Sequence, residues 1–76
     1  MNGENRIVVN PEILVGKPII QGTRISVEFI IELLAEGWSH QQVLENYPQI
    51  TDQDIQASLR YVAELLKHHR VYPLAI

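Results

Sequence analysis

The spacing of apolar residues predicts two short strands followed by three helices. The runs 6–9 and 17–21 are rich in Ile and Val, which favour extended backbone. From Val27 onward the apolar residues recur at helical spacing. Helices are expected at about residues 27–36, 40–46 and 52–69. Residues 1–5 are expected to be a flexible N-terminus, and residues 6–76 a single domain.

Helix-capping residues support these boundaries. Ser26 is a good N-cap for the first helix, and Gly37 stands where a left-handed residue ends it. Ser39 and Gln42 have the spacing of a capping box at the start of the second helix. Tyr47-Pro48 ends that helix because proline cannot continue it. The segment 12–15 fits either one helical turn or an anchored loop.

The apolar faces of the helices predict the fold class. Only three glutamates interrupt the first helix, so it should lie at the centre of the domain or of a dimer. A short helix, a turn and a longer helix form the helix-turn-helix pattern. The sequence therefore predicts a mainly α fold: a small three-helix helix-turn-helix domain with a short β N-terminal arm or hairpin and an extended C-terminal tail. The apolar stripe of the third helix comprises Ile55, Leu59, Val62, Ala63 and Leu66.

Composition adds an expectation about assembly and location. The chain has 76 residues, 46% of them hydrophobic, and no cysteine. Small domains without disulfides or metals often gain stability by oligomerising, so a homodimer is expected. No apolar run reaches the length of a membrane span and no signal peptide is evident, which predicts a cytoplasmic protein without membrane contact.

The sequence gives no support for catalysis. Gly16-Lys17-Pro18 lacks the spacing of a phosphate-binding loop. His40, His68 and His69 do not form a metal-ligand set, and no serine has an evident base. We therefore expect neither an enzyme nor a cofactor or metal site.

Several motifs together resemble the domain-of-unknown-function family 433. They are Gly16-Lys17-Pro18, Gly22-Thr23-Arg24-Ile25 with Val27, Gly37-Trp38-Ser39, Tyr47-Pro48, and Thr51-x-x-Asp54-Ile55 leading to Leu59-x-Tyr61. The resemblance extends from about Arg6 to Leu74, and Ser26 stands where the family usually has proline. It implies a helix-turn-helix fold and the role of an antitoxin, often paired with a PIN-like toxin. Such antitoxins resemble others that bind their own operator DNA as dimers.

The third helix carries the residues best suited to read DNA. Its first half offers Gln53, Gln56 and Arg60, which can pair with adenine and guanine edges. Arg6, Lys17 and Arg24 could contact phosphates from the β arm. The net charge of −3 and the nearby Asp52 and Asp54 argue against DNA. The alternative is a solvated helix face on a protein–protein interaction module that never binds DNA, with Arg24 structural.

The C-terminal tail supplies candidate contacts to a partner. Tyr72, Leu74 and Ile76 alternate along an extended apolar segment, which could add a strand to another protein or fill a groove. A toxin is one candidate partner. The alternatives are a tail folded onto its own domain, a tail exchanged between the subunits of a dimer, or a disordered tail.

Overall fold

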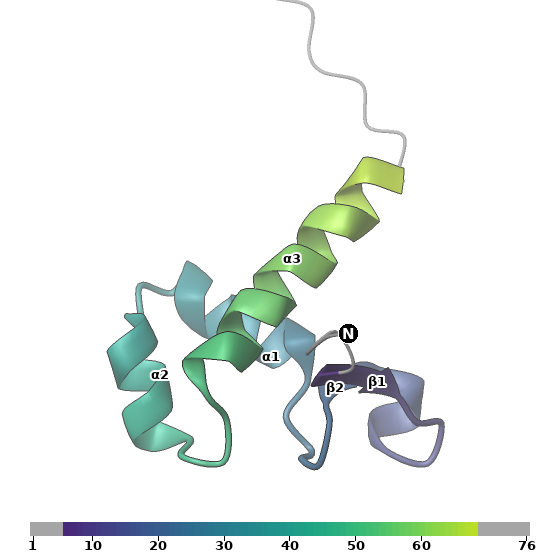
Figure 1. Cartoon of the computed structure of the whole chain (residues 1–76), viewed down its shortest axis with the longest axis horizontal. Coiled ribbons are helices and arrows are strands. Elements are labelled where there is room, and N and C mark those ends of the chain that lie inside the picture. The colour runs from purple at the N-terminus through teal and green to yellow at the C-terminus, as the bar shows by residue number, and fades with distance from the viewer. Residues whose placement is uncertain (1–5, 69–76) are drawn as a thin grey trace, which may run out of the picture.

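The computed structural model describes residues 6–68, which form a hairpin followed by three helices (Figure 1). This confirms the predicted fold class, and the first two helices lie within one residue of their expected bounds. The predicted last helical residue, His69, lies outside the described residues. The elements are β1 (Ile7–Val9), the short 3₁₀ turn η2 (Leu14–Gly16), β2 (Pro18–Ile20), α1 (Val27–Ala35), α2 (His40–Asn46) and α3 (Asp52–His68).

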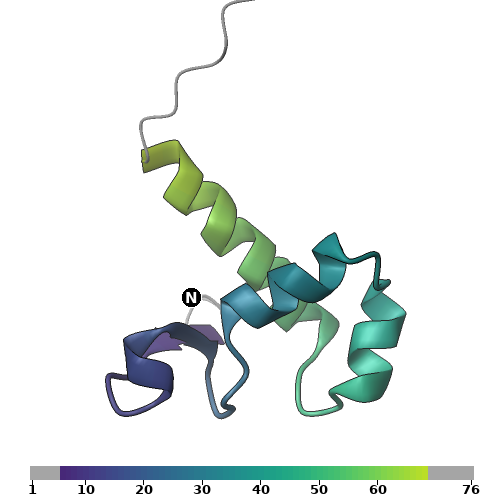
Figure 2. The same ribbon diagram turned by 180° about the vertical axis from the view of Figure 1, so that it is seen from behind.

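The two strands pair with each other as an antiparallel hairpin. Ile7 pairs with Ile20, and Val9 with Pro18, so the β arm is closed within one chain. A further bridge joins Ile19 to Ser26 and brings the start of α1 against the hairpin. Figure 2 shows the hairpin beside the N-terminal end of α1. Because two short strands are barely stable alone, their packing on the helices must hold them together.

For segment 12–15 the sequence left open a helical turn or an anchored loop. The structure has the short 3₁₀ turn η2 there, between the two strands. Leu14, Val15 and Gly16 have φ values of 51°, 58° and 79°, so this turn is left-handed. Glycine accepts that conformation freely, whereas a branched residue is strained in it. Packing does not offset this strain at Val15, because the residue is 94% exposed.

The predicted caps are present. Ser26 Oγ accepts a hydrogen bond from the Phe29 backbone N–H at 2.9 Å. Ser39 and Gln42 form the reciprocal capping box at the start of α2. Gly37 has a φ of 100°, which suits glycine and ends α1 as expected.

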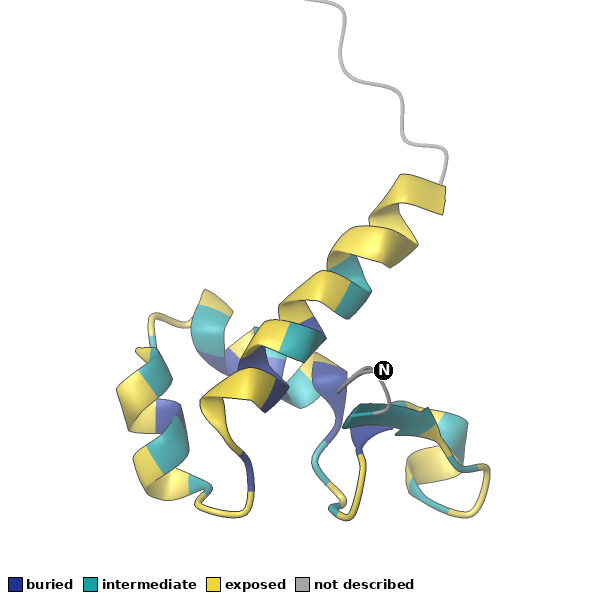
Figure 3. Cartoon of the chain, viewed as in Figure 1, coloured by how far each residue is buried: buried dark blue, intermediate teal, exposed yellow. Residues whose placement is uncertain are grey.

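The core lies where α1, α2, β2 and the first turns of α3 meet (Figure 3). Phe29 and Tyr47 pack at its edge with their rings nearly perpendicular and their centroids 5.4 Å apart. Trp38 packs against the same core. The buried cluster comprises Ile20, Ile30, Leu33, Val43, Ile50 and Ile55.

The apolar stripe of α3 is buried only at its N-terminal end. Ile55 is fully buried, but Leu59 is 39% exposed and Leu66 is 58% exposed. Figures 1 and 3 show the reason, because the second half of α3 extends beyond the other elements. The helical spacing identified Ile55 correctly, but the fully buried Ser58 shows that the core-facing side is rotated away from Leu59.

Candidate nucleic-acid interface

The start of α3 is fixed by a reciprocal hydrogen-bonded cap. Asp54 Oδ2 accepts a hydrogen bond from the Thr51 backbone N–H at 2.9 Å. In return, Thr51 Oγ1 accepts one from the Asp54 backbone N–H at 3.2 Å. This is a capping box in which aspartate takes the usual place of glutamate. It turns the Asp54 carboxylate toward the protein, where the residue is only 6% exposed.

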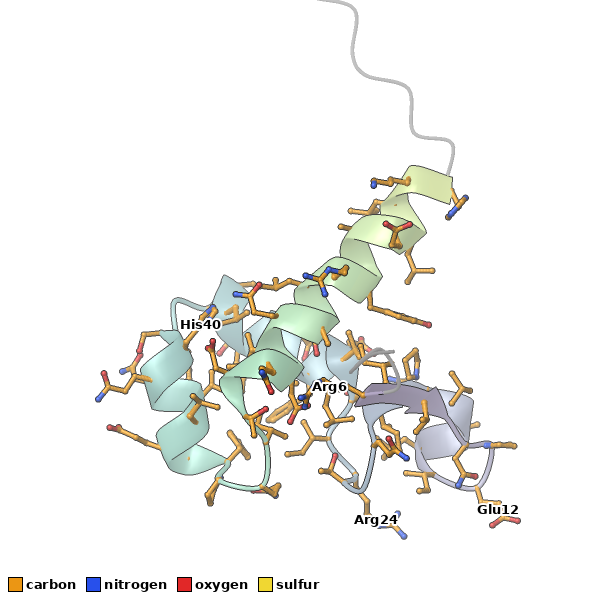
Figure 4. All side chains as sticks on the ribbon, viewed as in Figure 1. Arg6, Glu12, Arg24 and His40 are labelled. Carbon is orange, nitrogen blue, oxygen red and sulfur yellow. The ribbon has the colours of Figure 1, made fainter. Side chains whose placement is uncertain are left out.

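Arg6 connects this cap to the β hairpin. Its Nη1 lies 3.0 Å from Asp54 Oδ1, and its Nη2 donates a 2.6 Å hydrogen bond to Gln53 Oε1. Figure 4 shows Arg6 between β1 and the start of α3. The sequence analysis predicted a phosphate contact for Arg6, whereas the structure places it in an ion pair across 48 positions of the chain. The same pair offsets the charge of Asp54, which had counted against DNA binding.

Three of the predicted DNA-binding residues lie together on α3. Gln53, Gln56 and Arg60 are exposed and line one open groove beside Arg6, with a volume of about 640 Å³. At 100° per residue, the three side chains leave the helix within about 60° of one another. Glu64 lies at the far end of the groove and pairs with Lys67 at 3.4 Å. The spacing in the sequence therefore identified a real polar face.

Lys17 and Arg24 lie elsewhere. Both line a separate hollow beside α1, together with Val15 and Phe29. Arg24 stands at the edge of the molecule that is distant from α3 (Figure 4). The structure therefore does not bring these two residues to the groove of Gln53 and Arg60.

Lys17 also has a partner of its own. Its ammonium lies 2.9 Å from Glu28 Oε1. The hydrogen bond to Glu28, together with the charge of that carboxylate, raises the pKa of Lys17 above its ordinary value. Thr23 Oγ1, rather than Arg24, fixes the turn before α1 by donating to the Ile20 carbonyl and accepting from the Ile25 N–H.

Asp52 lies on the outer side of the α3 start. Its Oδ1 is 2.9 Å from His40 Nδ1, which joins the first residues of α2 and α3 (Figure 4). Both side chains are well exposed. The two aspartates therefore have different environments, since Asp54 is buried and capping whereas Asp52 stays on the surface.

The predicted partner-binding residues Tyr72, Leu74 and Ile76 lie outside the described part of the chain. Within residues 6–68, no group of His, Asp and Glu side chains is arranged to hold a metal ion. Among the helices described there, none is both long enough and apolar enough to cross a membrane.

The fold and this face define a small helix-turn-helix domain whose last helix exposes a polar surface. The profile of the family described as "Protein of unknown function (DUF433)" matches residues 7–62. The chain therefore belongs to this family, as its motifs predicted. No curated protein matches the sequence.

A solved structure agrees with this assignment. It is the crystal structure of a DUF433 member protein from Anabaena variabilis, which is 28% identical to this chain with a TM-score of 0.78. The similarity covers 83% of this chain and 62% of the Anabaena chain. This chain thus matches less than two thirds of that protein's length.

Proposed function

We propose that this protein is an antitoxin-like regulator that binds operator DNA through the polar face of α3. The observation that carries the proposal is the exposure of Gln53, Gln56 and Arg60 in one groove at the start of the second helix of a helix-turn-helix. In such units the first half of that helix enters the major groove.

The chemistry of the face suits base recognition. Glutamine amides can pair with adenine edges, and arginine can form two hydrogen bonds with guanine. Gln53 and Arg60 are seven positions apart, a rise of about 10 Å along the helix. That rise matches about three base pairs at 3.4 Å per step.

Electrostatics limits the affinity of a single copy. The chain has a net charge of −3, and Glu64 lines the groove itself. Asp54 is paired with Arg6 and turned inward, so it opposes phosphates less than the sequence suggested. Modest binding per copy favours a homodimer that reads two half-sites, which is the usual arrangement for this motif.

The antitoxin part of the proposal includes a PIN-like toxin as a protein partner. The predicted contacts Tyr72, Leu74 and Ile76 belong to this part. An alternative function is a protein–protein interaction module that does not bind DNA. The net charge of −3 and the exposed Asp52 favour that alternative, because negative charge repels the phosphates of DNA.

Selection from a random pool of DNA duplexes tests the proposal directly. We expect enrichment of a common sequence whose affinity falls with salt, with a log–log slope of about −0.9 per phosphate contact. Failure to enrich any sequence at low salt would refute DNA recognition and leave the interaction module.

Variants of Arg60 then test the assigned face. Arg60→Ala should weaken binding to the selected site by about 1–3 kcal/mol and relax its specificity at one position. Arg60→Lys keeps the charge but loses the paired hydrogen bonds, so it should relax specificity as well. Arg24→Ala is the control, because Arg24 lies away from the groove. Unchanged affinity in Arg60→Ala would remove this residue from the interface.

A further inference from the structure

A second, apolar groove runs between α1 and the second half of α3. Its volume is about 290 Å³, and Glu28 and Glu32 stand at its rim. Six other residues line the groove, five from the two helices and one from β2. These six are Pro18, Val27, Ile31, Tyr61, Val62 and Leu65.

This groove leaves apolar surface uncovered along the second half of α3. Leu65 is 54% exposed, and the last turns of α3 extend past the rest of the domain (Figure 3). Short helical segments without tertiary packing are marginally stable in water. A segment that covers the apolar groove would therefore stabilise this part of α3.

We propose that residues 69–76 of the same chain fold back along α3 and fill this groove. The segment follows directly after His68, where α3 ends in the described structure. Tyr72, Leu74 and Ile76 alternate, so an extended segment would direct all three side chains to one face. That face would lie against Ile31, Val62 and Leu65.

The segment is long enough for this path. From His68 back to Tyr61 is a rise of about 10 Å along the helix. The eight residues 69–76 span up to about 26–29 Å when extended. A reversal that uses the first two or three residues still leaves Tyr72–Ile76 to lie along the groove.

The size of the surface favours this segment over a second protein. A stable protein–protein interface buries about 800 Å² and 20–30 residues on each side. The six groove residues, even with the exposed Leu59 and Leu66, fall well short of that number. A tethered segment needs less contact area, because a short linker provides an effective concentration of about millimolar.

Charge also fits the segment. The rim of the groove carries Glu32, and the segment begins with His69 and Arg70. The segment also has no acidic side chain that Glu32 would repel. An acidic segment would instead be repelled by this rim.

The apolar groove and the proposed DNA interface are neighbours on α3 that share Tyr61. Their other α3 side chains differ, and Leu65 and Arg60 leave the helix about 140° apart. Loss of one function should leave the other measurable. Docking would also mean that any partner binding Tyr72, Leu74 and Ile76 must first displace them from the groove.

Isotope-filtered NMR on the full chain tests the proposal. In a mixture of ¹³C-labelled and unlabelled chains, we expect contacts from the Tyr72 ring to methyl groups of Ile31, Val62 or Leu65 within single chains. Contacts only between labelled and unlabelled chains would overturn the proposal in favour of a second copy. The absence of any contact would overturn it as well.

A matched pair of variants on α3 provides the second test. Leu65→Asp should reduce amide-exchange protection of Tyr72–Ile76 at least about tenfold, because it places a charge in the groove. Leu66→Asp is the control, since Leu66 is similarly exposed but does not line the groove. Both should keep their helical circular dichroism. Equal protection in the two variants would overturn the proposal.

Discussion

Replacing Asp54 with alanine should destabilise the protein far more than replacing Asp52. Both residues are aspartates in the first turn of α3, so their carboxylates interact similarly with the helix dipole. Their contacts differ, because Asp54 is 6% exposed and accepts hydrogen bonds from the Thr51 backbone and from Arg6. The Asp52 side chain is 59% exposed, and among residues 6–68 its polar partner is His40.

The magnitude follows from these contacts. Loss of a helix cap costs about 1 kcal/mol, within a range of 0.5–2. The ion pair adds about 0.5–1 kcal/mol rather than the value for a fully buried pair, because the Arg6 side chain is 32% exposed and partly solvated. Asp54→Ala should therefore cost about 2 kcal/mol. Asp52→Ala should cost about 0.5 kcal/mol, from the dipole and an exposed contact.

Urea unfolding followed by circular dichroism measures the difference. With a slope of about 1 kcal/mol per molar urea for so small a protein, Asp54→Ala should lower the midpoint by about 2 M. Asp52→Ala should lower it by about 0.5 M on the same scale. Thr51→Ala removes the other half of the cap and should fall between them. Equal midpoint shifts for the two aspartate variants would refute the assignment of Asp54 as the structural residue.

Four further variants test the core, the left-handed turn and the Lys17 ion pair. Ile55→Ala should cost about 2–5 kcal/mol because Ile55 is fully buried, whereas Leu66→Ala should stay within about 0.5 kcal/mol; thermal unfolding compares them. Val15→Asn should stabilise the protein by about 0.5–1 kcal/mol, since asparagine tolerates the left-handed conformation better, and an unchanged or lower midpoint would contradict this. Glu28→Gln should lower the pKa of Lys17 in an NMR titration. Because that pKa is raised in the folded state, the pair stabilises the protein while Glu28 is ionised and the pH is below about 10.5, and this contribution disappears as pH rises through the folded-state value.

The sequence predicted the elements well because their signals are local. Ser26, Ser39 and Gly37 each mark a helix end through hydrogen bonds or backbone angles within a few residues. The polar face of α3 could also be predicted from the sequence, because helical spacing alone places Gln53, Gln56 and Arg60 together. These predictions needed no knowledge of distant contacts.

The features that the sequence missed depend on distant contacts. Arg6 and Asp54 are 48 positions apart, and nothing in the local pattern of either residue signals that they pair. Lys17 and Arg24 were grouped with α3 because of their charge, yet the hairpin places them in a separate hollow. The extent of burial along α3 was missed for the same reason, because it depends on where α1 and the hairpin end.

The contact between Arg6 and Gln53 narrows what the polar face can recognise. Arginine has only hydrogen-bond donors, so the atom that faces it must be the carbonyl oxygen of the Gln53 amide. The amide NH₂ group is then the part of Gln53 left for a ligand, and it can only donate. Pairing with both an acceptor and a donor of adenine, as the proposed DNA binding envisages, therefore falls to Gln56, whose amide makes no such contact among the described residues. Arg6→Ala would free the Gln53 oxygen and should change base preference at one position of a selected site, beyond any loss of stability.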